Sequence, residues 1–216
     1  MGDSGTYNCS VDSERLHGEA VCAIGSEALE IKSEKGFLRL DYADLRDMRL
    51  LDYHVVLDTA GGKVNLSALG FQTEDFFEKL WQAYAGRSRE ALFVEGEALY
   101  TGEGDYFYTE QGVEAHGIAK VELYHDCLCL FPHNDKARRI PLCFADEPQA
   151  ADFCIALRLD TGDSYEVARL GRSFDAVAER LLQRRKRLYN VGIKPIGSSP
   201  TLLWNGWAPM PKAMIG

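Results

Sequence analysis

The chain carries the same run of residues twice, and this repeat constrains its fold more than any other feature. In the first copy, residues 57–70 lead into residues 73–80, and in the second, residues 159–171 lead into residues 173–181. In both copies, two short apolar runs separated by a turn precede a Leu-Gly step and an amphipathic stretch. Each copy is therefore predicted to form a two-stranded hairpin followed by a helix.

A repeat of this kind predicts two domains of one fold rather than one large domain. We place the domains at residues 1–88 and 89–191, followed by an apolar tail at residues 192–216. Hydrophobic residues make up 46% of the 216-residue chain, which is enough to give each domain its own core.

Short apolar runs with turn residues between them predict mainly β structure in both domains. In residues 28–33, Leu29 and Ile31 alternate with charged residues, as in a strand with one buried face. Residues 1–17 show no clear periodicity and are expected to form a loose polar leader. Residues 87–116 have no evident counterpart in the first copy.

The two amphipathic stretches are predicted to be helices that cover the sheets. Thr73 and Ser173 suit the first positions of the two helices. Phe76 and Leu80 fall on one face, and Leu181 takes the place of Leu80 in the second copy. We therefore expect Leu80 and Leu181 to be buried at equivalent positions, each closing its own sheet.

The net charge of −9 argues against polyanionic partners. Acidic side chains outnumber basic ones in both domains, whereas nucleic acid and anionic membranes attract a positive face. The basic residues 184–187 suit such a patch, but they also suit the negative end of a helix dipole, which is the interpretation we favour. Without a secretory signal or an apolar run long enough to span a membrane, the sequence predicts a cytoplasmic protein. Its charge predicts no nucleic-acid partner and disfavours membrane binding.

No sequence motif predicts catalysis, because the common phosphate-binding, dinucleotide-binding, hydrolase and zinc-protease patterns are all missing. We therefore expect no enzyme activity and no cofactor. The best metal candidate is His125, Cys127 and Cys129, which an extended strand would direct to one face. A fourth ligand would come from Cys143 or Cys154. Zinc ligands more often come as pairs on turns, so we interpret all six cysteines as reduced thiols and expect no metal.

The tail at residues 192–216 is apolar and contains two of the three tryptophans. Its prolines argue against a helix and favour an extended arm. We expect Leu203, Trp204 and Trp207 to be partner-binding residues, since tryptophan is a common anchor at interfaces. The arm is expected to dock on the barrels of its own chain, or on a neighbour and so produce a homodimer by exchange. The alternative is a disordered end.

The order of these elements resembles the pleckstrin-homology-like (PH-like) superfamily, including its bacterial and GRAM-type members. The resemblance is carried by residues 29–31, 38–40, 55–59 and Leu69-Gly70 in the first copy, and by residues 128–130, 139–142, 157–161 and Leu170-Gly171 in the second. It implies a mainly β, α+β fold with two antiparallel barrels, each closed by a C-terminal α-helix. It also implies binding or scaffolding rather than catalysis. Phosphoinositide-binding members cluster basic residues in the first strand pair, whereas here Lys32, Lys35 and Arg39 alternate with acidic residues.

We therefore expect a non-catalytic cytosolic binding or scaffold protein whose PH-like domains bind a protein or peptide partner. One mode is the addition of a partner strand to an exposed sheet edge. Two alternatives stay open: a peripheral adaptor for anionic lipid that uses residues 184–187 and Lys194, and a metal protein or enzyme built on His125, Cys127 and Cys129. Salt-dependent binding to vesicles would support the first alternative, and stoichiometric metal would support the second.

Overall fold

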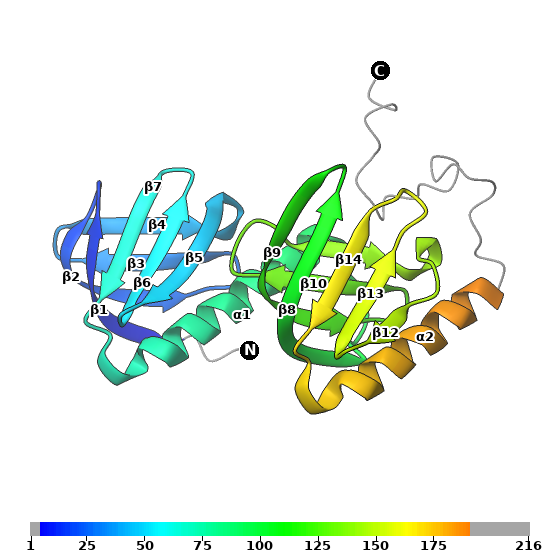
Figure 1. Ribbon diagram of the computed structural model, residues 1–216. Coiled ribbons are helices and arrows are strands. Elements are labelled where there is room, and N and C mark those ends of the chain that lie inside the picture. The colour runs from blue at the N-terminus through cyan, green and yellow to red at the C-terminus, as the bar shows by residue number, and fades with distance from the viewer. Residues whose placement is uncertain (1–4, 191–216) are drawn as a thin grey trace, which may run out of the picture. The chain divides into compact units, whose positions relative to one another are not determined.

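The computed structural model describes residues 5–190, which form two units (Figure 1). One unit holds the described residues up to Ala91 together with His133–Asp135. The other holds Leu92–Pro132 and the described residues from Lys136 onward. Each unit contains one seven-stranded antiparallel sheet followed by one α-helix, so the predicted mainly β, α+β fold class is confirmed.

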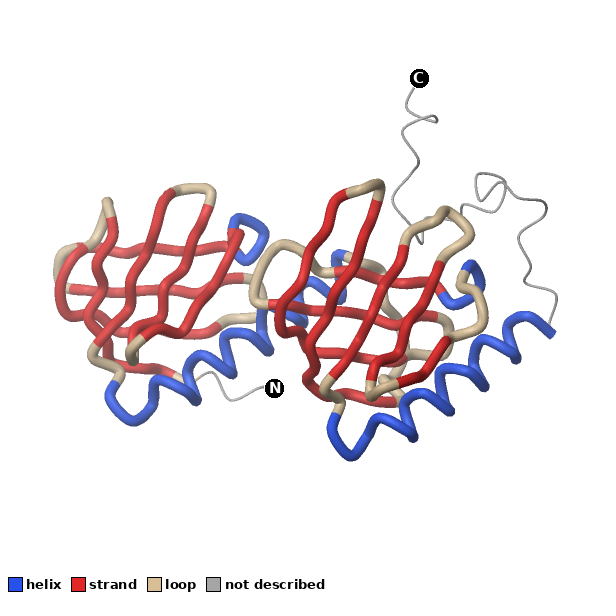
Figure 2. The backbone as a smooth tube through the Cα atoms, in the orientation of Figure 1, coloured by secondary structure: helices blue, strands red, loops and turns tan. Residues whose placement is uncertain are grey.

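The sheet of the first unit has the strand order β4-β3-β2-β1-β7-β6-β5. Figure 2 shows its strands running in two crossing directions, because the sheet curls on itself. The strands are β1 (Thr6–Ser13), β2 (His17–Ile24), β3 (Ala28–Ser33), β4 (Gly36–Asp41), β5 (Leu45–Leu51), β6 (His54–Thr59) and β7 (Gly62–Ser67).

The sheet of the second unit repeats this order as β11-β10-β9-β8-β14-β13-β12. Among the strands of residues 5–190, β8 and β9 are the longest, and the edge strands β11 and β12 are the shortest. The strands are β8 (Tyr100–Glu110), β9 (Val113–Leu123), β10 (Cys127–Pro132), β11 (Arg138–Pro141), β12 (Gln149–Ala151), β13 (Cys154–Arg158) and β14 (Ser164–Ala168).

Each sheet leads into its helix through a short 3-10 turn that opens with a glycine. Gly70 and Gly171 have φ of 61° and 57°, a left-handed conformation that glycine adopts without strain. The helices that follow are α1 (Thr73–Ala91) and α2 (Phe174–Asn190). The ungapped match across the Leu-Gly step is thus confirmed by the backbone of both copies. Neither helix, nor any other within residues 5–190, is long and apolar enough to cross a membrane.

The two helices close two separate hydrophobic cores, as predicted. Leu80 is 1% exposed and belongs to the core of the first unit, while Leu181 is 0% exposed and belongs to the core of the second. Phe76 and Trp81 add further bulk on α1, and Val177 takes the place of Phe76 on α2. Each sheet therefore buries its concave face against its own helix.

The expectation that residues 1–17 are a loose leader was wrong. Thr6–Ser13 forms β1, which joins β2 to β7 in the middle of the first sheet. Tyr7, Cys9 and Val11 point into the core, and the polar residues between them face outward. The apolar residues alternate regularly with polar ones, but few of them are strongly hydrophobic. The segment as a whole is therefore polar, and its strand periodicity is easy to overlook. β8 (residues 100–110) is the counterpart of β1 in the second unit, so this part of residues 87–116 does have a counterpart in the first copy.

The sequence repeat aligns Leu57 of the first hairpin with Leu159 of the second, and the structure shows that this alignment is wrong by two residues. Leu57 pairs with Val64 in the first unit, and Leu157, not Leu159, pairs with Tyr165 in the second. Leu159 lies in the longer turn after β13. A shift of two residues keeps every side chain on the same face of a strand, so the apolar pattern alone does not exclude it.

Candidate binding site

The sheet edges are the first places to look for a binding site, because an edge strand has unpaired backbone groups. The four edge strands are β4 and β5 in the first unit, and β11 and β12 in the second. They differ in length and in what already occupies them.

The edge of β5 is already paired with an extended segment of the first unit. The Met48 amide donates a hydrogen bond to the His133 carbonyl over 2.8 Å, and the Asp135 amide donates one to the Arg46 carbonyl over 3.0 Å. The His133 ring also packs against Trp81 of α1, with 3.9 Å between ring centroids. This edge therefore holds a strand-like ligand from its own chain.

The edges of the second unit are short and interrupted by proline. β12 has three residues and follows Pro148, which occupies the position equivalent to Met48 and has no amide hydrogen to donate. β11 has four residues and ends at Pro141. Short edges with proline resist strand addition.

The edge of β4 is longer and open. Ser33 and Gly36 pair across a two-residue turn, so the next residue of β4, Phe37, belongs to a pair that exchanges no hydrogen bonds. The backbone groups of Phe37 and, two residues on, Arg39 therefore point away from β3. Within residues 5–190, no backbone group pairs with this outer side of β4.

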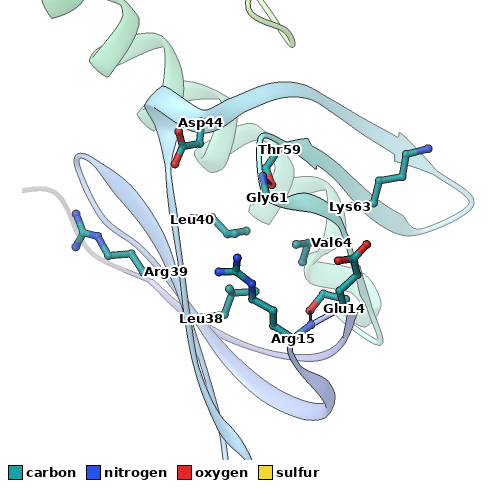
Figure 3. A pocket seen from close by; sticks show the side chains of 11 residues that line it. Glu14, Arg15, Leu38, Arg39, Leu40, Asp44, Thr59, Gly61, Lys63 and Val64 are labelled. Carbon is teal, nitrogen blue, oxygen red and sulfur yellow. Dashed lines mark hydrogen bonds between the residues drawn. The ribbon is translucent and has the colours of Figure 1, made fainter.

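A pocket of about 90 Å³ opens beside this edge (Figure 3). Leu38 and Leu40 of β4 and Val64 of β7 supply apolar walls. Arg15, from the turn between β1 and β2, extends toward these leucines, and Asp44 lies at the rim. The pocket thus combines an apolar lining with charged residues of both signs, since Glu14, Arg39 and Lys63 also line it.

The cations around the pocket are not arranged to hold a polyphosphate. Figure 3 shows Arg39 and Lys63 pointing away from the pocket. Arg39 instead forms an ion pair with Asp41 at 2.9 Å and another with Glu30 at 3.5 Å. This arrangement does not favour the lipid-binding alternative at this site.

The equivalent end of the second sheet is filled by large side chains. The strand registers place Tyr108, Tyr165 and Arg138 where the first unit has Ser13, Val64 and Leu38. Arg138 and Tyr165 contact the carboxylate of Glu110, and Tyr108 contacts Arg138.

The carboxylate of Glu110 organises this closed end. Arg138 binds it with Nε at 2.7 Å, and the Tyr165 hydroxyl donates to it over 2.6 Å. Burial, and then the neighbouring Glu110 carboxylate, raise the pKa of Tyr165 above its ordinary value. The Arg138 guanidinium also lies 4.8 Å from the centre of the Tyr108 ring. The second unit therefore has a packed ion pair where the first has a pocket.

The proposed metal set of His125, Cys127 and Cys129 does not come together. His125 is exposed in the turn before β10, whereas both cysteines are fully buried in that strand. The prediction that a strand directs all three residues to one face was therefore wrong, because the strand begins only at Cys127. Residues 5–190 contain no group of three or more His, Cys, Asp or Glu side chains that could hold a metal ion.

The basic run 184–187 is partly used inside its own unit. Arg185 donates from Nε to the Ala145 carbonyl over 3.0 Å, and Lys186 lies 3.6 Å from a carboxylate oxygen of Glu147. The predicted partner-binding residues Leu203, Trp204 and Trp207 lie outside the described residues. Their role stays a prediction.

Sequence reasoning missed the pocket because part of its lining, residues 13–15, comes from the segment that we expected to be a leader. Ser13 and Arg15 lie at the end of β1 and in the following turn. The available signal was the alternation of Tyr7, Cys9 and Val11, which predicts a strand and hence a turn at residues 14–16.

Comparisons with known proteins leave the family open. No protein-family model and no curated protein matches the chain. It is similar to the C-terminal domain of an unknown protein from Leishmania infantum, at 12% identity over 38% of this chain and 82% of that one, with a TM-score of 0.33. It is also similar to the Spt16D Pob3N heterodimer, at 16% identity over 74% of this chain and 84% of that one, with a TM-score of 0.32.

These similarities are too low to carry an argument, so the fold is judged from the elements themselves. Two seven-stranded antiparallel sheets, each followed by a helix that covers its core, resemble a PH-like fold.

Proposed function

We propose that this chain is a tandem PH-like protein, related to the bacterial and GRAM-type members, that acts as a non-catalytic binding protein in the cytoplasm. Its partner is a protein or peptide, and an extended segment of that partner pairs with the edge of β4. One observation carries the proposal: β4 combines outward-facing backbone groups with an adjacent pocket. In strand addition, backbone hydrogen bonds supply affinity and a neighbouring pocket supplies specificity.

The other edges support the choice of β4 by contrast. β5 shows that this sheet accepts an extended segment, since Met48 already bonds to His133. β11 and β12 are short and carry Pro141 and Pro148 at or beside their ends. β4 is thus the edge at which a partner would find both free hydrogen-bonding groups and room for a side chain.

The size and chemistry of the pocket define what the partner inserts. A volume of about 90 Å³ suits one short side chain rather than a lipid headgroup. Leu38, Leu40 and Val64 would contact its apolar part, and Arg15 or Asp44 would contact a polar end.

A displayed library of random peptides, selected on the full-length protein, tests the proposal. Hydrogen exchange with a selected peptide should then slow at the outward amides of Phe37 and Arg39. The Met48 amide serves as an internal control, because it is already hydrogen bonded and gains little protection.

Two substitutions of Phe37 test the contributions of its backbone amide and its side chain separately. Phe37→Pro removes the outward amide hydrogen without removing a bond to β3, and should weaken peptide binding about fivefold or more. Phe37→Ala keeps the amide and controls for the exposed ring. Equal binding by the two variants, or protection confined to another edge, would refute strand addition at β4. Binding to anionic vesicles instead of peptides would favour the lipid alternative.

A further inference from the structure

Cys9 and Cys22 face each other in the core of the first unit. They lie on the neighbouring strands β1 and β2, and their Sγ atoms are 3.0 Å apart. Cys9 stands opposite Ala20, and Cys22 stands opposite Tyr7, so the two cysteines are diagonal neighbours on one face of the hairpin. Both are buried and carry free thiols in this structure.

We infer that Cys9 and Cys22 are an oxidative modification site, at which a small peroxide converts the two thiols into an intramolecular disulfide. An S–S bond is about 2.04 Å long, so the sulfurs need to approach by only about 1 Å. Residues 6–9 of β1 pair only with β2, so a small adjustment there breaks no bond to β7. The pairing of β1 with β7 begins at Ser10.

The two thiols are suited to unequal roles in this reaction. The hydrogen bond from Cys22 lowers the pKa of Cys9, and the same bond raises the pKa of Cys22, together with burial. The thiolate is the nucleophilic form of cysteine. Cys9 is therefore the first thiol to react, and Cys22 is the one that resolves the product.

The chemistry needs only hydrogen peroxide as the oxidant. The Cys9 thiolate attacks one peroxide oxygen, so an S–O bond forms, the O–O bond breaks, and the hydroxide that leaves takes up a proton to become water. The resulting sulfenic acid is attacked by the sulfur of Cys22, which gives up its proton as the S–S bond forms and the S–O bond breaks. Hydroxide leaves with that proton as a second water. Two thiols are oxidised, one peroxide is reduced, and two waters are released.

A second buried pair provides a matched control within the same chain. The Sγ atoms of Cys127 and Cys129 are 3.7 Å apart, but both residues belong to β10, which is paired on each side. Alternate residues of one strand are separated by about 6.6 Å along its axis, whereas a disulfide holds its Cβ atoms about 3.8 Å apart. Burial also raises the pKa of Cys129. This pair should stay reduced under conditions that oxidise the first.

The second repeat supplies a suitable substitution for the test. The strand registers place Val121 of β9 where the first unit has Cys22 of β2. Cys22→Val therefore replaces a buried thiol with the apolar residue that the same fold already holds at this position. Cys127→Ala is the control variant on the second pair.

The experiment treats the full-length protein with hydrogen peroxide, alkylates the remaining thiols under denaturing conditions, and maps the linked peptides by mass spectrometry. We expect the wild-type protein and Cys127→Ala to lose two hydrogen atoms in a link between Cys9 and Cys22, and Cys22→Val to form no such link. Thermal unfolding should shift upward on oxidation in the first two proteins, because a cross-link restricts the unfolded chain. The shift should reverse with dithiothreitol.

Two results would overturn the inference. One is recovery of all six alkylated thiols from the oxidised wild-type protein. The other is a peroxide-induced link that maps to different cysteines or persists in Cys22→Val. If Cys22→Val fails to fold, Cys9→Ala answers the same question, because it removes the other partner of the pair.

Discussion

The two units follow nearly the same backbone course but use equivalent positions in opposite ways. At one end of the sheet, Ser13 and Val64 leave a pocket in the first unit, whereas Tyr108 and Tyr165 fill the same end of the second. Strand order and entry into the helix are the same in both. The closed end of the second unit thus has larger side chains at these positions, together with the Arg138–Glu110 ion pair. A binding role fits the unit in which this end is open.

An ion pair that occurs in both units also differs between them, in its exposure to solvent. Arg39 meets Glu27 at 3.8 Å in the first unit, where the arginine side chain is 43% exposed. Its counterpart Arg139 meets Asp126 at 2.7 Å in the second unit and is 5% exposed. The two ion pairs occupy equivalent positions in the fold, but the arginine is exposed to solvent in the first unit and buried in the second.

The largest expected effect concerns a position at which the two units should agree. Leu80→Ala and Leu181→Ala each leave a cavity under a helix, and each should lower the free energy of unfolding of its own unit by about 2–5 kcal/mol. Urea denaturation with hydrogen exchange, which reports each sheet separately, measures both values. A loss below about 1 kcal/mol in either unit would mean that its helix does not close its core.

The equivalent ion pairs are expected to contribute different amounts of stability in the two units. Arg139→Ala leaves Asp126 partly buried without its partner and should cost about 2–4 kcal/mol, somewhat below the value for fully buried pairs because Asp126 keeps some solvent contact. Arg39→Ala removes exposed pairs and should cost less than about 1 kcal/mol. Both variants are measured by urea denaturation at the same ionic strength. Equal costs would show that burial does not distinguish the two sites.

The repeat, the helices and the β-rich class could be predicted from sequence because they depend on local periodicity. Leu80 and Leu181 fall at helical spacing after a Leu-Gly step, and both are buried. The glycine of the Leu-Gly step adopts a left-handed conformation, which limits the ways in which the last strand can connect to the helix. These signals lie within short windows of the chain.

The binding surface could not be predicted in the same way, because it depends on contacts between distant residues. Nothing near Met48 in sequence shows that its amide bonds to His133, and nothing near Arg139 shows that it is buried. The relative volumes of Val64 and Tyr165 are visible in sequence. Their effect on the pocket follows only once β1 is known to be a strand and the hairpin register is known.

The smallest expected effect comes from a charged group present in only one unit. Asp75, in the first turn of α1, forms an ion pair with Lys79 at 2.9 Å and accepts a hydrogen bond from the Tyr7 hydroxyl at 2.8 Å. Lys79, and then Tyr7, lower the pKa of the Asp75 carboxyl. The corresponding residue of α2 is Ala176, so the second unit lacks this arrangement.

A carboxyl whose pKa is lowered in the folded state stabilises that state at pH values above its unfolded pKa of about 3.9, and the contribution disappears as the pH falls through the lower folded pKa. Asp75→Asn should therefore reduce the stability of the first unit at neutral pH, and the difference from wild type should shrink to nothing in strong acid. Asp175→Asn, in the first turn of α2, controls for the interaction of any carboxylate with a helix dipole. Urea denaturation across the pH range measures both variants. A deficit of Asp75→Asn that does not change with pH, or that equals the deficit of Asp175→Asn, would show that Lys79 and Tyr7 contribute nothing beyond the dipole, and this difference between the units would then have no energetic consequence.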